Sequence, residues 1–273
     1  MDLFQAPGIL EYHNMDPELF RWGFIVIRWY SLAYIGGLMM GWWYLGKLTQ
    51  QKKSPTTKLQ VDDFIMWATL GIILGGRLGY VFFYNPSFYF QNPGDILQVW
   101  DGGMSFHGGF LGVVFTTILF CRRRGINLLG FADQIAIVSP LGLLFGRIAN
   151  FINGELWGGE STLPWAMKFP SGGEIYRHPS QLYEALGEGL LLFLLLNWLY
   201  HKTNAKKHRG LITGVFFIGY GFARYLVEFV REPDAHLGRF GDIITMGQIL
   251  SLPMLAIGMG FIYYAIRKKG KVR

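Results

Sequence analysis

The chain has 273 residues, of which 51% are hydrophobic, 17% aromatic and only 16% charged, and its mean hydropathy is +0.28. This composition is typical of a polytopic membrane protein and argues against an ordinary soluble domain. A formal charge of +7 does not indicate a nucleic-acid-binding protein here, because the basic residues are spread along the chain and form no single patch. The single cysteine, Cys121, excludes an internal disulfide and any cysteine-based metal cluster.

Seven apolar runs, taken in chain order, are long enough to cross about 30 Å of hydrocarbon. The first twenty residues contain no Lys or Arg, so they lack the basic start of a cleavable signal peptide, and we expect the first span to be retained. The sequence therefore predicts an all-α membrane protein, a seven-transmembrane helix bundle that forms a single integral-membrane domain over residues 1–273. Its predicted spans are 24–45, 64–87, 104–120, 130–150, 182–200, 211–230 and 244–266.

The segments between these spans differ in charge and composition. Alternate segments hold 16 Lys and Arg on one side and 5 on the other, so the positive-inside rule places the N-terminus outside and the C-terminus in the cytoplasm. Residues 152–180, between the fourth and fifth spans, are rich in Gly, Pro and aromatic residues. We expect them to form a small extracytoplasmic cap.

The four remaining arginines lie within predicted spans, where a charged side chain costs roughly 2.5–3.5 kcal/mol. Arg28 is near a span end and can extend its charged group to the interface. Arg77, near the middle of the second span, is interpreted either as a lipid-phosphate contact or as a contact inside the bundle. Arg147 and Arg224 belong to polar motifs.

The motif "GRIANFINGELWG", residues 146–158, follows a strongly apolar stretch. Arg147 and Asn150 are three residues apart and would share one helical face, with Glu155 following. This pattern favours a binding site. The alternative is that Arg147 extends to the interface and that the amides cap the helix end.

The sixth predicted span carries the motif "ARYLVEFVREPD", which places Arg224, Glu228 and Arg231 at i, i+4 and i+7. These residues form one ladder of alternating charge. A structural ion pair between Arg224 and Glu228 is the simpler interpretation of Glu228. Arg224 is deeper in the span and needs an anionic neighbour.

Three further polar positions have both a functional and a structural interpretation. His107 in "WDGGMSFHGGFLG" is flanked by glycines that let another backbone or a lipid approach, so it is a packing residue or a proton acceptor. Tyr30 belongs to an interfacial aromatic belt or has a buried partner. In "RHPSQLYE", residues 177–184, Ser180 is the expected N-cap of the fifth span, with Glu184 in its first turn.

No HExxH, GxSxG, Walker A or CxxC motif occurs, so the common hydrolase, nucleotide-dependent and thiol-redox chemistries lack their usual residues. Arginine, amide, histidine and carboxylate side chains remain, in the outer half of the predicted bundle. Because guanidinium groups match phosphate geometry, these residues predict a membrane site for an anionic phospholipid headgroup.

"GRIANFINGELWG" closely resembles the signature of bacterial prolipoprotein diacylglyceryl transferases. The blocks "RWYSLAY", "GGRLGY", "WDGGMSFHGG", "RHPSQLYE", "YLVEFVREPD" and "MGQILSLPM" are also similar to that family, in the same order. The resemblance implies an enzyme of the bacterial cytoplasmic (inner) membrane that takes part in lipoprotein biosynthesis by protein lipidation. It implies transfer of the sn-1,2-diacylglyceryl group from phosphatidylglycerol to the lipobox cysteine of a prolipoprotein signal peptide, with glycerol phosphate released.

The resemblance also implies site residues. Its catalytic set falls on Tyr30, His107, Arg147 and Arg224. Phosphatidylglycerol binding would involve Arg147, Asn150, Glu155, Gly158, Arg224, Glu228 and Arg231, to which we add Arg77. The residues are chemically suitable, since the arginines can bind a phosphate leaving group and His107 can take the thiol proton. No metal or cofactor is expected, and the expected partners are membrane lipids and the peptide, not nucleic acid.

Two functions of other classes are the alternatives. A seven-span lipid transporter or flippase that binds anionic phospholipid would have polar residues on both sides of the midplane. A seven-helix receptor or scaffold would need no constellation of arginine, amide and histidine.

Overall fold

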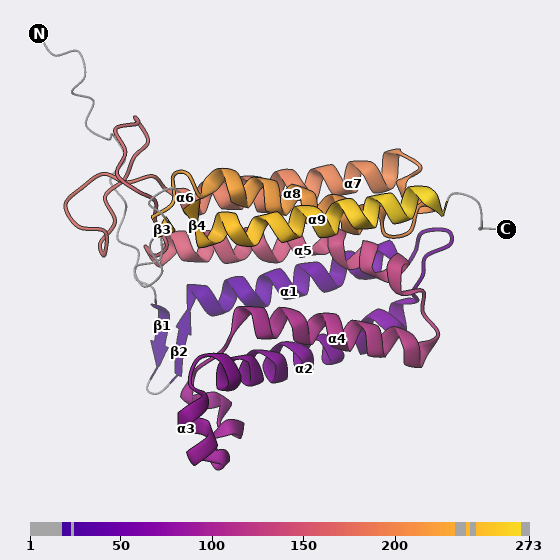
Figure 1. The fold of residues 1–273 in the computed structure, drawn as a ribbon, viewed down its shortest axis with the longest axis horizontal. Helices are drawn as coiled ribbons and strands as arrows, with labels where there is room; N and C mark the ends of the chain where they lie inside the picture. Colours follow the sequence, from indigo (N-terminus) through magenta and orange to yellow (C-terminus); the bar gives the residue numbers. More distant parts are fainter. Residues whose placement is uncertain (1–17, 23–24, 233–238, 241–243, 269–273) are drawn as a thin grey trace, which may run out of the picture. The chain divides into compact units, whose positions relative to one another are not determined.

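The computed structural model describes residues 18–22, 25–232, 239–240 and 244–268, and this part of the chain is mostly helical (Figure 1). The chain divides into two compact units, Met1–Trp43 with Ala132–Arg273, and Tyr44–Phe131. Residues 1–17, which bear on the signal-peptide prediction, lie outside the described residues. The single integral-membrane domain stays a prediction.

Within the described residues, four helices have the length and composition to cross a membrane, and Leu211–Val227 is a shorter apolar helix. The four are Lys58–Phe83, Leu128–Ile152, Ser180–Lys202 and Met246–Arg267. These apolar helices identify a membrane protein. The count of seven spans, the cap and the sidedness of the termini stay predictions.

The first predicted span begins later than its apolar run suggests. Strand β1 (Glu18–Trp22) pairs antiparallel with β2 (Ile25–Arg28), and helix α1 starts only at Trp29 and continues to Leu48. β-Branched residues in "IVIR" favour this strand over a first helical turn. Arg28 therefore ends a strand and does not lie within the first helix. Its Nη2 atom is 4.0 Å from Oε1 of Glu18 across the hairpin. Tyr30 is the second residue of α1.

In the Tyr44–Phe131 unit, helix α2 (Lys58–Phe83) packs antiparallel against α4 (Phe106–Arg124). Helix α2 starts six residues before the predicted span, because Thr57 and Gln60 form a reciprocal capping box. Ser105 caps α4 by accepting a hydrogen bond from the Gly108 amide at 3.2 Å.

Glycines let the backbones of α2 and α4 touch. A Cβ atom on Gly112 would lie 2.0 Å from the carbonyl oxygen of Gly71, and one on Gly75 would lie 2.4 Å from that of Gly108. Small residues four apart are typical of close helix pairs in membranes. The glycines after His107 therefore admit another backbone, that of α2.

Short helices that the apolar runs do not predict join α2 to α4: α3 (Pro86–Gln91) and 3₁₀ turns at Pro93–Leu97 and Val99–Asp101. Arg77 organises this connection, since it is buried and donates to the carbonyl oxygens of Asp95 at 2.6 Å and Ile96 at 2.9 Å. Its guanidinium carbon also lies 5.1 Å from the centre of the Tyr89 ring. Arg77 therefore contacts the connection between α2 and α4, and its role toward a lipid stays a prediction.

The other unit holds the remaining helices: α5 (Leu128–Ile152), α6 (Ser180–Glu184), a π-helical segment (Ala185–Leu191), α7 (Leu192–Lys202), α8 (Leu211–Val227) and α9 (Met246–Arg267). A 3₁₀ turn, Ala205–Lys207, precedes α8, and strands β3 (Arg239–Phe240) and β4 (Ile244–Thr245) pair before α9.

Hydrogen bonds fix the direction in which these helices run. The Asp133 carboxylate, in the first turns of α5, accepts from the amides of Gly210 at 2.7 Å and Thr213 at 2.8 Å, where α8 begins. Since Arg147 and Arg224, near the other ends of α5 and α8, both reach Glu184, the two helices run in the same direction. At the other end Thr245, which caps α9, donates to Glu228 at the end of α8 at 2.6 Å. The last turns of α5 and α8 thus meet the first turns of α6 and α9.

Candidate functional site

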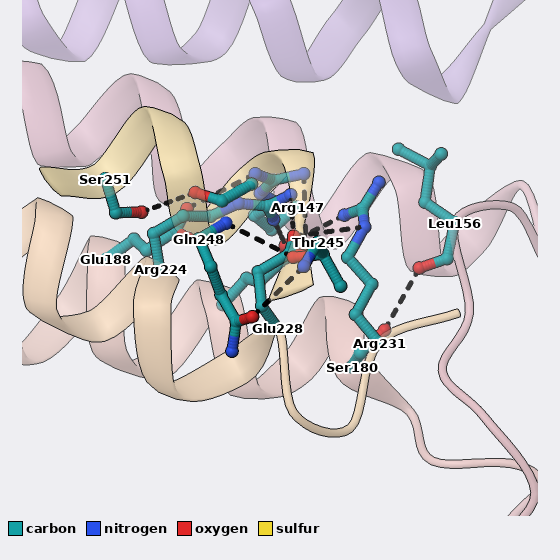
Figure 2. Close-up of polar contacts among 12 residues, drawn as sticks. Arg147, Leu156, Ser180, Glu188, Arg224, Glu228, Arg231, Thr245, Gln248 and Ser251 are labelled. Atoms are coloured by element: carbon teal, nitrogen blue, oxygen red, sulfur yellow. Dashed lines mark hydrogen bonds and ion pairs between the residues drawn. The ribbon is translucent and has the colours of Figure 1, made fainter. Parts of the chain in front are cut away.

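Three arginines converge where these helix ends meet (Figure 2). The Nη1 atom of Arg147 on α5 lies 3.3 Å from Oε2 of Glu184 on α6. Oε1 of Glu184 accepts a hydrogen bond from Arg231 at 2.9 Å, and another from Arg224 on α8. Glu184 has no exposed side-chain surface, so one buried carboxylate joins three guanidinium groups from two helices and the segment that follows α8.

Two more buried glutamates complete the cluster. Oε2 of Glu188, in the π-helical segment, accepts from Nη2 of Arg147 at 3.3 Å. Glu228 pairs with Arg224 four residues before it, as the sequence predicts, and accepts from the Thr245 hydroxyl. Arginine and glutamate therefore alternate through the cluster.

The burial of these side chains shows which of them an approaching ligand meets first. The three arginines and three glutamates balance one another in formal charge, which offsets the cost of burying each of them. Arg147 and Arg224 keep 16% and 17% of their side-chain surface exposed, whereas Glu228 keeps 4% and Glu184 none. An approaching molecule meets the guanidinium groups first.

The motif around Arg147 builds a turn at the end of α5. Asn150 donates to Oε1 of Glu155 at 2.8 Å, and the backbone carbonyl of Glu155 accepts from Gln181 at 2.7 Å. Leu156 has a positive φ of 58°, which a residue other than glycine adopts only when its surroundings enforce it. The Asn150 amide thus orients Glu155, and both lie at the same end of the helices as Arg147.

Gly158 allows a close approach of two chain segments. Its amide donates to the His178 carbonyl at 2.8 Å, and a Cβ atom there would lie 2.4 Å from the carbonyl oxygen of Val230. Gly158 also pairs with Arg231 in an isolated bridge. Arg231, four residues after the end of α8, is thereby tied to the connection between α5 and α6.

Two expectations about "RHPSQLYE" are corrected. Pro179 is the N-cap residue of α6, and Ser180 instead donates to the Leu156 carbonyl at 3.1 Å. Glu184 is the last residue of α6 and not a first-turn residue, and its carboxylate is the centre of the cluster. Burial lowers the pKa of His178, whose ring nitrogen Nδ1 lies 3.3 Å from the Tyr183 hydroxyl.

The predicted site residues outside the cluster lie as follows. The Tyr30 hydroxyl shares a hydrogen bond with Tyr34 at 2.9 Å and interacts electrostatically with Glu155 and Arg147. His107, in the Tyr44–Phe131 unit, is exposed at the second position of α4, with its ring centre 5.8 Å from that of Phe106. The roles of Tyr30, His107 and Arg77 toward a lipid stay predictions.

Sequence reasoning missed Glu188 and Tyr220 and underrated Glu184. Tyr220, on α8, interacts electrostatically with Glu184 and Glu188. It interacts in the same way with Arg147 and Arg224. Acids within an apolar run were the available signal, since an intramembrane ionisable residue indicates a functional site as strongly as an arginine does.

The fold and these contacts can be compared with known proteins. The family described as prolipoprotein diacylglyceryl transferase matches residues 17–264. A phosphatidylglycerol-prolipoprotein diacylglyceryl transferase of Paramagnetospirillum magneticum is 52% identical, over 96% of this chain and 98% of that protein. Proteins of the same name from Rhodospirillum rubrum and Rhizobium meliloti are 52% and 49% identical, over 95% and 92% of this chain and 96% and 92% of their own lengths. The resemblance of the motifs is confirmed, and the chain belongs to the prolipoprotein diacylglyceryl transferase family.

Proposed function

We propose that this chain transfers the sn-1,2-diacylglyceryl group of phosphatidylglycerol to the thiol of a lipobox cysteine in a prolipoprotein signal peptide. Membership of the family makes it a transferase of lipoprotein biosynthesis, and the names of its relatives supply both substrates. We place it as a multi-pass protein of the bacterial cytoplasmic (inner) membrane, with an extracytoplasmic N-terminus and a cytoplasmic C-terminus. A seven-helix bundle with an extracytoplasmic cap at residues 152–180 belongs to the same proposal.

The observation that carries this proposal is the convergence of Arg147 and Arg224 on Glu184, with both guanidinium groups partly exposed. Arginine binds phosphate oxygens with two parallel donors, so the exposed parts of these two guanidinium groups suit the phosphodiester of the lipid. Because the carboxylates already fix both arginines, their donors are oriented before the lipid arrives. Preorganised donors of this kind stabilise negative charge that develops in a transition state.

The reaction forms a carbon–sulfur bond and breaks a carbon–oxygen bond. The cysteine sulfur attacks the glycerol carbon that carries the phosphate ester, and the electron pair of the broken bond leaves with glycerol phosphate. Arg147 and Arg224 would stabilise the charge on that leaving group. The thiol proton goes to a base, for which we propose His107, since a neutral imidazole accepts protons near pH 7. No step requires a metal or a cofactor.

The remaining residues of the proposed lipid site act on the two arginines or on the turn beside them. Glu228 and Arg231 share the ion pairs of the cluster, and Asn150 orients Glu155. Gly158 holds the connection against the end of α8. Tyr30 is kept as a member of the proposed site on the resemblance of its motif, and Arg77 is kept as the residue added from its place in the second predicted span.

A reconstitution experiment tests the proposal. Purified protein is incubated with phosphatidylglycerol and a lipobox peptide, and the products are analysed by mass spectrometry. We expect a thioether-linked diacylglyceryl peptide together with free glycerol phosphate, and neither product from a peptide with serine in place of cysteine. Lipid movement between leaflets without consumption of the cysteine peptide would instead identify a transporter.

A further inference from the structure

Four buried side-chain oxygens near the cluster accept no hydrogen bond from any residue in the described part of the chain. They are Oδ1 of Asn153 and the Oε atoms of Gln181 (Oε1), Glu184 (Oε2) and Glu188 (Oε1). All four are acceptors. A buried acceptor without a donor is costly, so these atoms indicate a ligand that donates hydrogen bonds.

Glu188 is the strongest of the four. Oε2 of Glu184 still lies 3.3 Å from Nη1 of Arg147, whereas Glu188 uses only Oε2 to bind Arg147. Its side chain is fully buried. It also lies in the π-helical segment Ala185–Leu191, and π-helical turns occur frequently at functional sites.

The charges around Glu188 select the kind of donor. Arg147 is bonded to the other oxygen of the same carboxylate, so a cation at Oε1 of Glu188 would lie close to this guanidinium group and be repelled by it. A hydroxyl group supplies the missing hydrogen bond without adding charge. The headgroup of phosphatidylglycerol carries hydroxyls on the carbons that follow its phosphate.

We propose that Oε1 of Glu188 accepts a hydrogen bond from a headgroup hydroxyl of phosphatidylglycerol and so selects this lipid. The inference rests on the proposed function. Arg147 binds the other oxygen of the same carboxylate, so it is placed to contact the phosphate while Glu188 contacts the adjoining glycerol. The Arg147–Glu188 ion pair would thus bind both the phosphate and the adjoining glycerol of a single headgroup.

A comparison of two lipids tests this. Phosphatidylpropanol has the same charge and the same three-carbon headgroup as phosphatidylglycerol but lacks the hydroxyls. We expect wild-type protein to prefer phosphatidylglycerol on the order of tenfold to a hundredfold in kcat/KM, the range for a hydrogen bond to a charged group. The preference is measured again, without turnover, as the stabilisation of detergent-solubilised protein by each lipid against thermal unfolding.

Variants separate recognition of the hydroxyl from damage to Arg147. Glu188→Gln, and Glu188→Asp if the first variant does not fold, should slow both lipids but reduce the preference to a few fold. Glu228→Gln is the matched control, since Glu228 is also buried and paired with arginine but its oxygens have partners. It should slow both lipids equally and keep the preference.

The outcomes are distinct. Equal use or equal binding of the two lipids by wild-type protein overturns the role of Glu188, and so does an unchanged preference in its variants. If wild-type protein transfers no diacylglyceryl group from phosphatidylglycerol, the proposed function fails. The thermal measurements then still decide whether Glu188 recognises the hydroxyl.

Discussion

The Nη1 atom of Arg147 on α5 lies 3.3 Å from Oε2 of Glu184 on α6, close to the end of α8. Glu184 also pairs with Arg224 and Arg231, so its loss would leave three partly buried guanidinium groups without their shared partner. Breaking a buried ion pair from one side typically costs about 3–5 kcal/mol. We expect Glu184→Ala to lower the free energy of unfolding by about that amount, measured by unfolding in mixed detergent micelles. A loss below about 1 kcal/mol would contradict this role.

Removing the partly exposed guanidinium group of Arg147 or of Arg224 should nearly abolish turnover. The loss of one preorganised donor to a developing anion costs about 2.7–4 kcal/mol, or roughly 10²–10³-fold in rate. We expect this loss for Arg147→Ala and for Arg224→Ala in the reconstituted transfer assay. Arg124→Ala is the control, because Arg124 is half exposed, pairs with Asp63 at 2.7 Å and ends helix α4, in which His107 is the second residue. It should retain wild-type rates, and near-normal rates in the two test variants would refute the phosphate-binding role.

His107→Asn should leave measurable residual transfer if His107 serves as the base. General base catalysis typically contributes roughly 10²–10⁴-fold, and a thiolate can still form without the imidazole. We expect His107→Asn to retain measurable transfer and to lose part of the pH dependence of the rate. Rates are measured over about pH 5.5–9. This range covers the ordinary pKa values of a free imidazole, about 6.5, and of a free cysteine thiol, about 8.5. A variant whose pH profile matches the wild type removes His107 from this role.

Gly158 should be intolerant of even a methyl group. A Cβ atom would lie 2.4 Å from the Val230 carbonyl oxygen and 2.7 Å from Cβ of His178. Overpacking of this kind costs about 1–3 kcal/mol, so we expect Gly158→Ala to lower the thermal midpoint. Gly146 belongs to the same motif, but a methyl group on it would meet nothing within 4 Å. Gly146→Ala should therefore be neutral or stabilising, and equal effects of the two substitutions would be evidence against the close approach.

His178 should make stability depend on pH. Burial lowers its pKa, so the unfolded chain binds a proton more readily than the folded one. The stabilisation is complete above the unfolded pKa of about 6.5 and is lost as pH falls from there through the lower folded pKa. We expect wild-type protein to lose more stability than His178→Gln between about pH 7 and pH 5. Identical losses in thermal unfolding would show that His178 does not titrate differently on folding.

The sequence predicted the part of the site that depends on helical spacing. Arg224 and Glu228 pair because four residues place them on one face of α8, and Arg147 and Asn150 both lie at the end of α5. The direction of α5 and α8 followed from an odd number of intervening spans. The convergence of Arg147 and Arg224 was therefore predictable.

Other features depend on partners far along the chain. Glu184 pairs with arginines 37 to 47 positions away, and no local pattern distinguishes that role from a first-turn acid. Glu188 lies between two glycines in an apolar run, and no arginine lies within four residues of it in the sequence to indicate a pair. The hairpin before α1 was missed because hydropathy does not separate a strand such as "IVIR" from the start of a helix.

The touching backbones of α2 and α4 limit how this part of the protein can deform. With the Gly71 carbonyl where a side chain of residue 112 would be, no acyl tail fits between the two helices along that seam. Helices α2 and α4 must therefore tilt or shift together as one rigid unit. Any lateral opening that admits phosphatidylglycerol or a prolipoprotein has to form along a different helix boundary.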